Sequence, residues 1–143
     1  MNEDILPGIP ETFSSFGSPL YRIPMREGIE SVQLVKYKEA LKVYQEDPED
    51  PNNIIWLGRR TAYLGRYREA CAIFSLGIEK YPNKPEFYRY RGHRFVTLRL
   101  LNIAVDDFEK AAEILKGILT SGGWAGFNYI AAEAEYKRKG YSL

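Results

Sequence analysis

The chain has 143 residues, of which 45% are hydrophobic and 27% are charged, and its formal net charge is +1. This balance excludes intrinsic disorder, and the length predicts one folded domain with a buried core. There is no uncharged apolar run of roughly 18 residues, which argues against a membrane-spanning helix. The first residues lack the basic and apolar stretches of a secretory signal, so we expect a cytoplasmic protein.

Residues 1–27 form a segment rich in proline and glycine. Four of the eight prolines of the chain lie within residues 1–24. Proline lacks an amide hydrogen and disfavours a helical residue before it, so this composition predicts extended, non-helical chain. The segment also carries many apolar residues, and we expect much of it to pack on the helices that follow.

Residues 28–46 are predicted to form one amphipathic helix, because apolar residues recur at steps of three and four. The residues expected on its inward face are Ile29, Val32, Val35, Leu41 and Tyr44. A turn rich in proline and acidic residues follows at 47–51.

Two consecutive segments, 51–84 and 85–118, match each other at a shift of 34 residues. The identical pairs are Pro51 and Pro85, Gly58 and Gly92, Leu64 and Leu98, Ala70 and Ala104, and Phe74 and Phe108. Each segment shows two apolar stripes of helical spacing with a break between them, which predicts an antiparallel helix pair. Neither pair covers its own apolar faces, so we expect the pairs to stack.

The two segments resemble the tetratricopeptide repeat (TPR). In the first, the resemblance rests on Gly58, Tyr67, Ala70, Phe74, Gly77 and Pro82, and in the second on Gly92, Phe95, Ala104, Phe108 and Ala111. It implies an all-α fold, a short right-handed α-solenoid of TPR-like helix pairs with single flanking helices. Residues 28–118 would then hold one partial and two full repeats, because residues 37–44 resemble residues 67–74. The departures from the family pattern are Thr61 for a tyrosine, Arg91 for a core leucine and Lys116 for the closing proline.

Residues 119–143 begin with a break at 120–123, and a last helix is predicted over about 124–139. One interpretation is a capping helix that covers the end of the solenoid. The other is the first helix of a third repeat without its partner, which would leave an apolar face for another chain. In that case Trp124 and Phe127 are the candidates for pairing with a second copy.

The sequence gives little support for catalysis. His93 is the only histidine and Cys71 the only cysteine, which is too few for a metal site or a catalytic triad. We expect Cys71 to be a buried small hydrophobic residue, and Asp106, Asp107 and Glu109 to form a solvated helix face. No enzymatic activity, metal or cofactor is predicted.

The middle of the chain is basic. Residues 59–99 contain eight arginines and two lysines against three glutamates, a net charge of +7. The resemblance implies a concave groove lined by the first helix of each pair. The residues at the corresponding positions are Asn52, Ile55, Arg59, Ala62, Tyr63, Glu86, Arg89, His93, Val96 and Thr97. Because guanidinium groups suit carboxylates, we expect this groove to accept an acidic, extended peptide.

Other interpretations of these residues stay open. The arginines can be solvated or can bridge acids of the same chain, and residues 1–24 can occupy the groove as an intramolecular ligand. The main hypothesis is a non-enzymatic protein-interaction module, and the second is a self-associating structural subunit. RNA binding is the third and least favoured, because the arginines show no single stripe with stacking aromatics.

Overall fold

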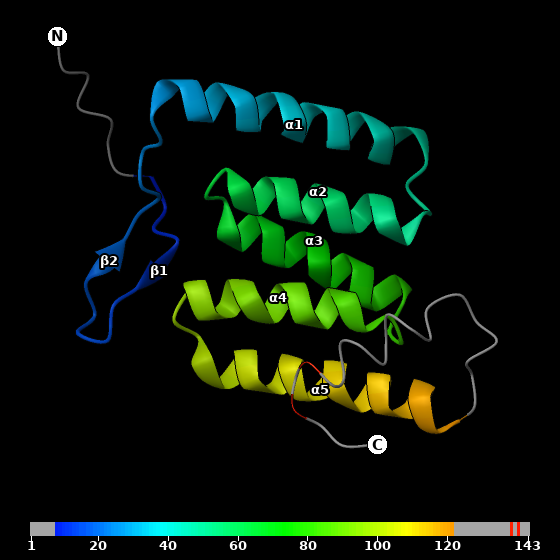
Figure 1. The fold of residues 1–143 in the computed structure, drawn as a ribbon. Helices are drawn as coiled ribbons and strands as arrows, with labels where there is room; N and C mark the ends of the chain where they lie inside the picture. The colour runs from blue at the N-terminus through cyan, green and yellow to red at the C-terminus, as the bar shows by residue number, and fades with distance from the viewer. Residues whose placement is uncertain (1–7, 122–137, 139, 141–143) are drawn as a thin grey trace, which may run out of the picture.

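The computed structural model describes residues 8–121, 138 and 140, and its helices lie side by side in chain order (Figure 1). They are α1 (Glu27–Glu46), α2 (Pro51–Tyr63), α3 (Tyr67–Lys80), α4 (Pro85–Thr97) and α5 (Leu101–Thr120). Each helix packs mainly against its neighbours in the sequence, as in other helical repeat proteins. The expected all-α solenoid is confirmed, with α2 and α3 as the first full pair and α4 and α5 as the second.

Both full repeats begin in the same way. Proline is the first residue of α2 and of α4, where its missing amide costs no helical hydrogen bond. Before α2, the Asp50 carboxylate accepts a hydrogen bond from the Asn52 amide at 2.8 Å and so caps the helix. The repeated proline therefore fixes where each pair starts.

The turns between paired helices are also equivalent. After α2, the Gly65 and Arg66 amides donate to the carbonyls of Ala62 and Thr61, which is a Schellman motif. After α4, the Arg99 and Leu100 amides bond in the same pattern to the carbonyls of Val96 and Phe95. The motif requires a left-handed residue, with φ 74° at Gly65 and φ 62° at Arg99. The second repeat thus places an arginine where the first has glycine.

Glycine lies at the closest approach of neighbouring helices. An aromatic ring of the next helix occupies the space beside each of three helical glycines. The pairs are Gly58 with Phe74, Gly77 with Phe87, and Gly92 with Phe108. A Cβ atom at these glycines would lie 2.4, 2.2 and 2.8 Å from the nearest ring carbon, which is far inside van der Waals contact. Side chains larger than hydrogen would therefore push the helices apart.

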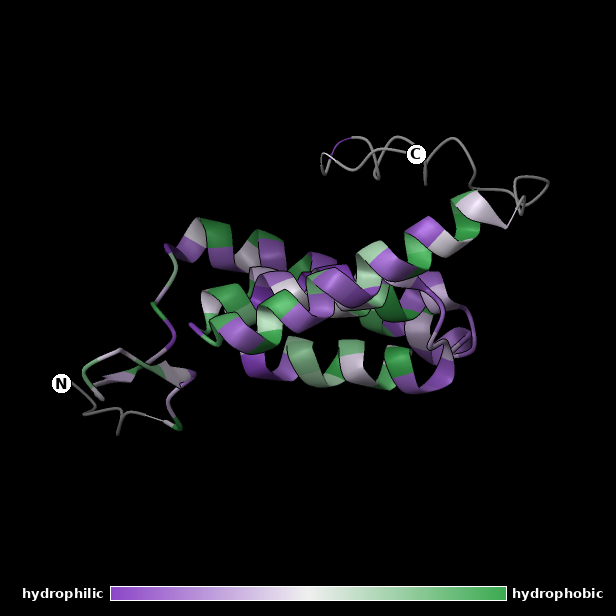
Figure 2. Ribbon diagram, turned by 90° about the horizontal axis from the view of Figure 1, so that it is seen from below, coloured by the Kyte–Doolittle hydropathy of each residue, from purple (hydrophilic) through white to green (hydrophobic). Residues whose placement is uncertain are grey.

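A small hairpin precedes the helices and lies at one end of the stack (Figures 1 and 2). Its strands, β1 (Thr12–Phe13) and β2 (Pro19–Leu20), are antiparallel. Thr12 donates a hydrogen bond to the Leu98 carbonyl, and Glu11 accepts one from the Arg68 amide at 3.1 Å. The hairpin segment therefore contacts the start of α3 in the first repeat and the turn after α4 in the second.

The apolar residues of this segment are less buried than expected. Ile9, Phe16 and Ile23 are 80%, 97% and 83% exposed, so the prediction that much of the segment packs on the helices is wrong for these residues, whereas Leu20 is half-buried. Residues 1–7 lie outside the described residues. Polar contacts to the backbone at Arg68 and Leu98 hold the hairpin in place. None of the described residues 8–24 lines the pocket between α2 and α4, so for them an intramolecular groove ligand is not observed.

The rotation of α1 also differs from the prediction. Ile29, Val32 and Val35 are more than half exposed, and the prediction of an inward position is wrong for them. The face toward α2 instead carries half-buried residues, namely Leu34, Tyr37, Ala40, Leu41 and Tyr44. The physical reason is that, among the described helices and strands, α1 packs on α2 alone, so only one stripe of α1 is covered.

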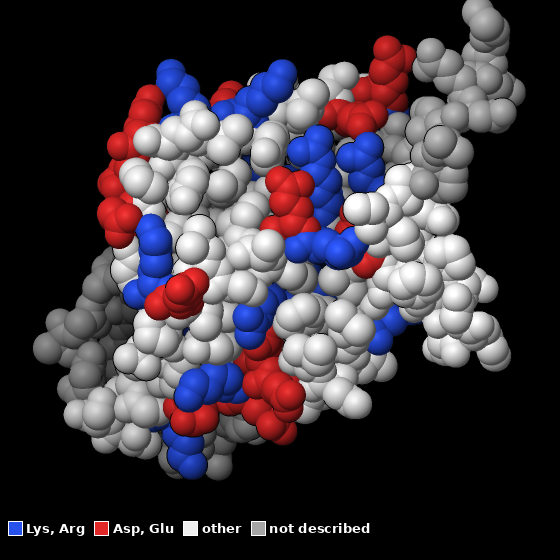
Figure 3. Space-filling view, turned by 180° about the vertical axis from the view of Figure 1, so that it is seen from behind, with Lys and Arg blue, Asp and Glu red and all other residues white. Residues whose placement is uncertain are grey.

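Charges on the surface are mixed. On the face turned away from the viewer in Figure 1, basic side chains lie beside acidic ones and not in one basic patch (Figure 3). Ion pairs among the described residues include Lys80 with Glu49 at 2.8 Å and Lys84 with Glu86 at 4.0 Å. Both pairs remain partly open to solvent, and ion pairs near the surface contribute about 0–1 kcal/mol, so they do not determine the fold.

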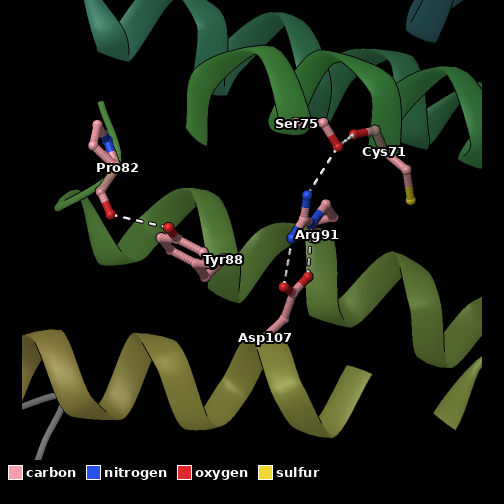
Figure 4. Close-up of polar contacts among 6 residues, drawn as sticks. All are labelled: Cys71, Ser75, Pro82, Tyr88, Arg91 and Asp107. Carbon is pink, nitrogen blue, oxygen red and sulfur yellow. Dashed lines mark hydrogen bonds and ion pairs between the residues drawn. The ribbon is translucent and has the colours of Figure 1, made fainter. Parts of the chain in front are cut away.

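A buried ion pair joins α4 to α5 (Figure 4). The Arg91 guanidinium donates two hydrogen bonds to the Asp107 carboxylate, at 2.8 and 2.7 Å, and a third to Ser75 Oγ at 3.0 Å. Asp107 is only 4% exposed, so its predicted place on a solvated face is wrong, whereas Asp106 and Glu109 are exposed as expected. The departure of Arg91 from the family pattern is thereby compensated, since the fork binds a carboxylate bidentately.

The corresponding residues of the first repeat are apolar. Thirty-four positions before Arg91 and Asp107 stand Leu57 and Ile73. The second repeat has therefore exchanged two hydrophobic residues for two opposite charges at equivalent positions. Thr61, another departure from the family pattern, is fully buried and donates to the Leu57 carbonyl at 2.8 Å, which satisfies its hydroxyl. Lys116, the third departure, lies within α5, which continues to Thr120.

The C-terminal predictions lie outside this description. Trp124 and Phe127 are not among the described residues, so capping and self-association through this segment stay predictions. No helix within the described parts of the chain is both long and apolar enough to span a membrane.

Breaking the buried pair should destabilise the second repeat. We expect Asp107→Ala to lower the free energy of unfolding by about 3 kcal/mol. This is the low end of the roughly 3–5 kcal/mol lost when a buried ion pair is broken, because the Arg91 side chain is 20% exposed and water can partly solvate it. The double variant Arg91→Leu/Asp107→Ile restores the residues of the first repeat and should remain within about 1 kcal/mol of the wild type. Urea denaturation followed by circular dichroism measures the free energy of unfolding of both variants. Equal losses in the two would contradict the conclusion that Asp107→Ala destabilises the chain by leaving Arg91 without its partner.

The left-handed arginine offers a second test. Arg99→Gly should stabilise the chain by about 0.5–1 kcal/mol, because glycine adopts this conformation without a Cβ clash. Arg99→Ala is the control, since it removes the same charge but keeps the Cβ atom, and we expect no gain from it. A similar gain in both variants, measured by thermal unfolding, would assign the effect to charge and not to the backbone.

Candidate functional site

A pocket of about 230 Å³ opens between α2 and α4. Its described lining consists of Arg59, Ala62, Tyr63, Phe74, Tyr90, His93 and Arg94. α2 supplies three of these residues and α4 three others at helical spacing, while α3 supplies Phe74. The first helices of both repeats therefore contribute to one concave site.

The floor of the pocket belongs to the core. Phe74 is 1% exposed and its ring stacks on that of Tyr90, with centroids 5.8 Å apart and planes inclined by 21°. Phe74 also occupies the space beside Gly58. Because these rings are packed on several sides, the floor is a rigid apolar surface.

Aromatic rings hold the arginines of α2 in place. The Arg59 guanidinium carbon lies 4.3 Å from the Trp56 ring centroid and 5.1 Å from that of Tyr90. Arg59 Nη2 also donates to Tyr63 Oη at 3.2 Å. Arg60 lies 5.0 Å from the Trp56 ring centroid and 5.7 Å from that of Tyr63. These cation–π contacts fix both guanidinium groups without neutralising their charge.

Aromatic rings also contact Arg89, His93 and Arg94 of α4. Arg94 lies 5.7 Å from the Tyr67 ring centroid. Arg89 lies 4.7 Å from the Tyr90 ring centroid and donates to Tyr90 Oη at 2.9 Å. The His93 ring meets Phe108 edge to face at 5.2 Å. Stacked arginines and tyrosine hydroxyls thus border the pocket on both sides.

The pocket is positive because its arginines have no acidic partner among the described residues. Within residues 8–121, no ion pair includes Arg59, Arg60 or Arg94. None of the described lining residues is acidic. The acids near the turn before α2 do not bridge to Arg59, and Glu49 pairs with Lys80 instead. An anion is the ligand class that this arrangement favours.

The structure brings together only part of the residue set expected for the groove. Arg59, Tyr63 and His93 line the pocket, together with Ala62. Ile55 is 7% exposed and belongs to the core, so we leave it out of the contact surface. The other expected residues are not among those that line the pocket, namely Asn52, Glu86, Arg89, Val96 and Thr97.

Three pocket residues were not predicted, namely Phe74, Tyr90 and Arg94. A signal for the last two exists in the repeat itself. Trp56 and Tyr90 occupy equivalent positions, as do Arg60 and Arg94, 34 residues apart. Each repeat therefore carries an aromatic residue, then a glycine two positions later, then arginine or histidine, and then an arginine. This short motif places an aromatic ring and two nitrogen-bearing side chains on one helix face.

Cys71 shows no sign of nucleophilic chemistry. It is 7% exposed, as expected, and burial raises the pKa of its thiol to about 11 despite the nearby Arg91 and Arg94. No group of three or more histidine, cysteine or acidic residues in the described part of the chain is arranged to hold a metal.

The raised pKa predicts slow alkylation of Cys71. At pH 8 a thiol of pKa about 9 is about one-tenth ionised, whereas a pKa of about 11 leaves about one-thousandth as thiolate. We expect iodoacetamide to modify the native chain on the order of a hundredfold more slowly than the urea-unfolded chain, measured by mass spectrometry. The native rate should still rise between pH 9 and 10, and equal native and unfolded rates would contradict the prediction.

Comparisons with known proteins agree with this fold. No family model and no curated protein matches the chain. Among solved structures, the chain is similar to the TPR-like "MamA MSR-1 C2", with a TM-score of 0.51 and 27% sequence identity. The match covers 59% of this chain and 50% of that one, so the chain spans about half the length of that structure. The likeness supports a protein-interaction module in general, built on an all-α solenoid with a TPR-like fold.

Proposed function

We propose that the chain is a non-enzymatic protein-interaction module that binds an extended acidic peptide along the concave side of α2 and α4. One observation carries this proposal. Arg59 and Arg94 line a pocket without an acidic partner among the described residues, and aromatic rings hold their guanidinium groups in place. An acidic side chain entering the pocket would supply the missing counter-charge.

The fixed position of Arg59 favours binding. A free arginine side chain loses about 2 kcal/mol of rotamer entropy when it is immobilised, and part of this cost is already met when rings hold the guanidinium. A hydrogen bond to a charged group contributes about 1.5–3 kcal/mol. A few such bonds therefore give measurable affinity even for a short peptide.

The surface beside the pocket suits an extended chain. Tyr63 and Val96 are 41% and 46% exposed and offer apolar contact area on α2 and α4. Asn52, Glu86 and Arg89 lie nearer the starts of these helices and could contact the peptide backbone or flanking residues. Asn52 is exposed, whereas Glu86 and Arg89 are half-buried.

A peptide titration tests the proposal. A fluorescent peptide rich in glutamate and its glutamine counterpart are titrated with the 143-residue chain, and anisotropy is recorded. We expect the glutamate peptide to bind and the glutamine peptide to bind at least tenfold more weakly. The double variant Arg59→Gln/Arg94→Gln should lose about tenfold or more in affinity for the glutamate peptide, the equivalent of at least one charge-assisted hydrogen bond.

Arg26→Gln provides the matched control. Arg26 is exposed just before α1, outside the pocket, and its replacement changes the net charge of the chain in the same sense. We expect it to leave the affinity unchanged. Equal weakening by the control would assign the effect to overall charge, and equal binding of both peptides would refute the proposed function.

A further inference from the structure

We propose that the pocket binds a phosphoryl group on the peptide in preference to a carboxylate, an inference that rests on the proposed peptide-binding function. The observation behind it is the number of side chains with hydrogen-bond donors around the cavity and the two helices that supply them. Arg59 and Tyr63 come from α2, whereas Tyr90, His93 and Arg94 come from α4. A single bound group would therefore meet donors from two opposing walls.

The shape of the anion decides which ligand uses these donors. A carboxylate is planar with two oxygens, and one arginine fork in its plane satisfies it well. A phosphate monoester has three terminal oxygens in a tetrahedral arrangement and a charge of about −1.5 to −2. Donors that approach from two helices fit the tetrahedral group, because its oxygens point in different directions.

The two tyrosines strengthen this preference. Tyr63 Oη accepts a hydrogen bond from Arg59 Nη2, and Tyr90 Oη accepts one from Arg89 Nη2. Since each phenol oxygen accepts from a cation, its own O–H is polarised and available to donate into the pocket. Arg59 meanwhile lies over the rings of Trp56 and Tyr90, so its edge N–H groups can bind a ligand. The hydroxyl and guanidinium donors together outnumber the hydrogen bonds that one carboxylate accepts.

The dimensions of the pocket fit a modified side chain. Its volume of about 230 Å³ lies below the roughly 300–1,000 Å³ typical of small-molecule and cofactor sites. A phosphoserine side chain fills such a space while its backbone stays on the surface. The apolar floor at Phe74 and Ala62 limits the depth of entry, which places the charged group at the level of the arginines.

Three peptides that differ at one central position test the inference. The position carries phosphoserine, glutamate or serine in an otherwise identical acidic sequence, and affinities are measured by calorimetry with the full 143-residue chain. We expect the phosphoserine peptide to bind about tenfold more tightly than the glutamate peptide, from an added charge-assisted hydrogen bond. Inorganic phosphate should compete only weakly, since it lacks the peptide contacts.

Variants of the tyrosines identify the donors. Tyr63→Phe/Tyr90→Phe keeps the Tyr90 ring beside Arg59 and the Tyr63 ring beside Arg60, but removes both hydroxyls. We expect the ratio of phosphoserine to glutamate affinity to fall from about ten toward one. Tyr21→Phe is the control, since Tyr21 is exposed in the N-terminal segment and outside the pocket, and it should keep the ratio of the wild type.

The outcomes separate this inference from the proposed function. Equal affinity for the phosphoserine and glutamate peptides would overturn the phosphoryl preference and leave the acidic-peptide function standing. Failure of both to bind would refute both. Tighter binding of a single-stranded RNA than of the phosphoserine peptide would also overturn the inference, because it would assign the pocket to phosphodiesters.

Discussion

The stack depends on the contact between glycine and aromatic rings at successive helix interfaces. Gly58, Gly77 and Gly92 each leave space that a ring of the next helix fills. This contact sets how closely α2, α3, α4 and α5 approach, and so it sets the distance between α2 and α4. Because Phe74 also forms the pocket floor, the same packing that holds the first repeat together determines the depth of the candidate site.

Much of the fold could be predicted from the sequence. A shift of 34 residues with matching proline, glycine and aromatic residues defines two helix pairs, because these residue types have strict backbone or packing requirements. The rotation of α1 could not be predicted in the same way. Its apolar residues cover more than one stripe, and periodicity alone does not reveal that only the stripe of Tyr37, Ala40 and Tyr44 has a packing partner.

The site was predicted less completely for a physical reason. Arg59, Tyr63 and His93 follow from the repeat positions, but stacking of guanidinium groups on rings depends on side-chain directions that spacing does not give. Ile55 was expected to line the groove, but its side chain is buried in the core. The burial of Asp107 was not predicted, because its ion-pair partner, Arg91, lies on another helix. The sequence did contain a signal, since the equivalent residues of the first repeat, Leu57 and Ile73, are both apolar.

The N-terminal hairpin has a mechanical consequence for the concave surface. Thr12 is tied to the turn after α4, and Glu11 to the start of α3, so one small element braces both repeats from outside. A solenoid normally flexes by slight rotations between successive repeats. Bending that widens or narrows the concave side must therefore strain the hydrogen bonds of Thr12 and Glu11, which lie outside the concave side. The N-terminal hairpin thus helps to set the curvature of the solenoid.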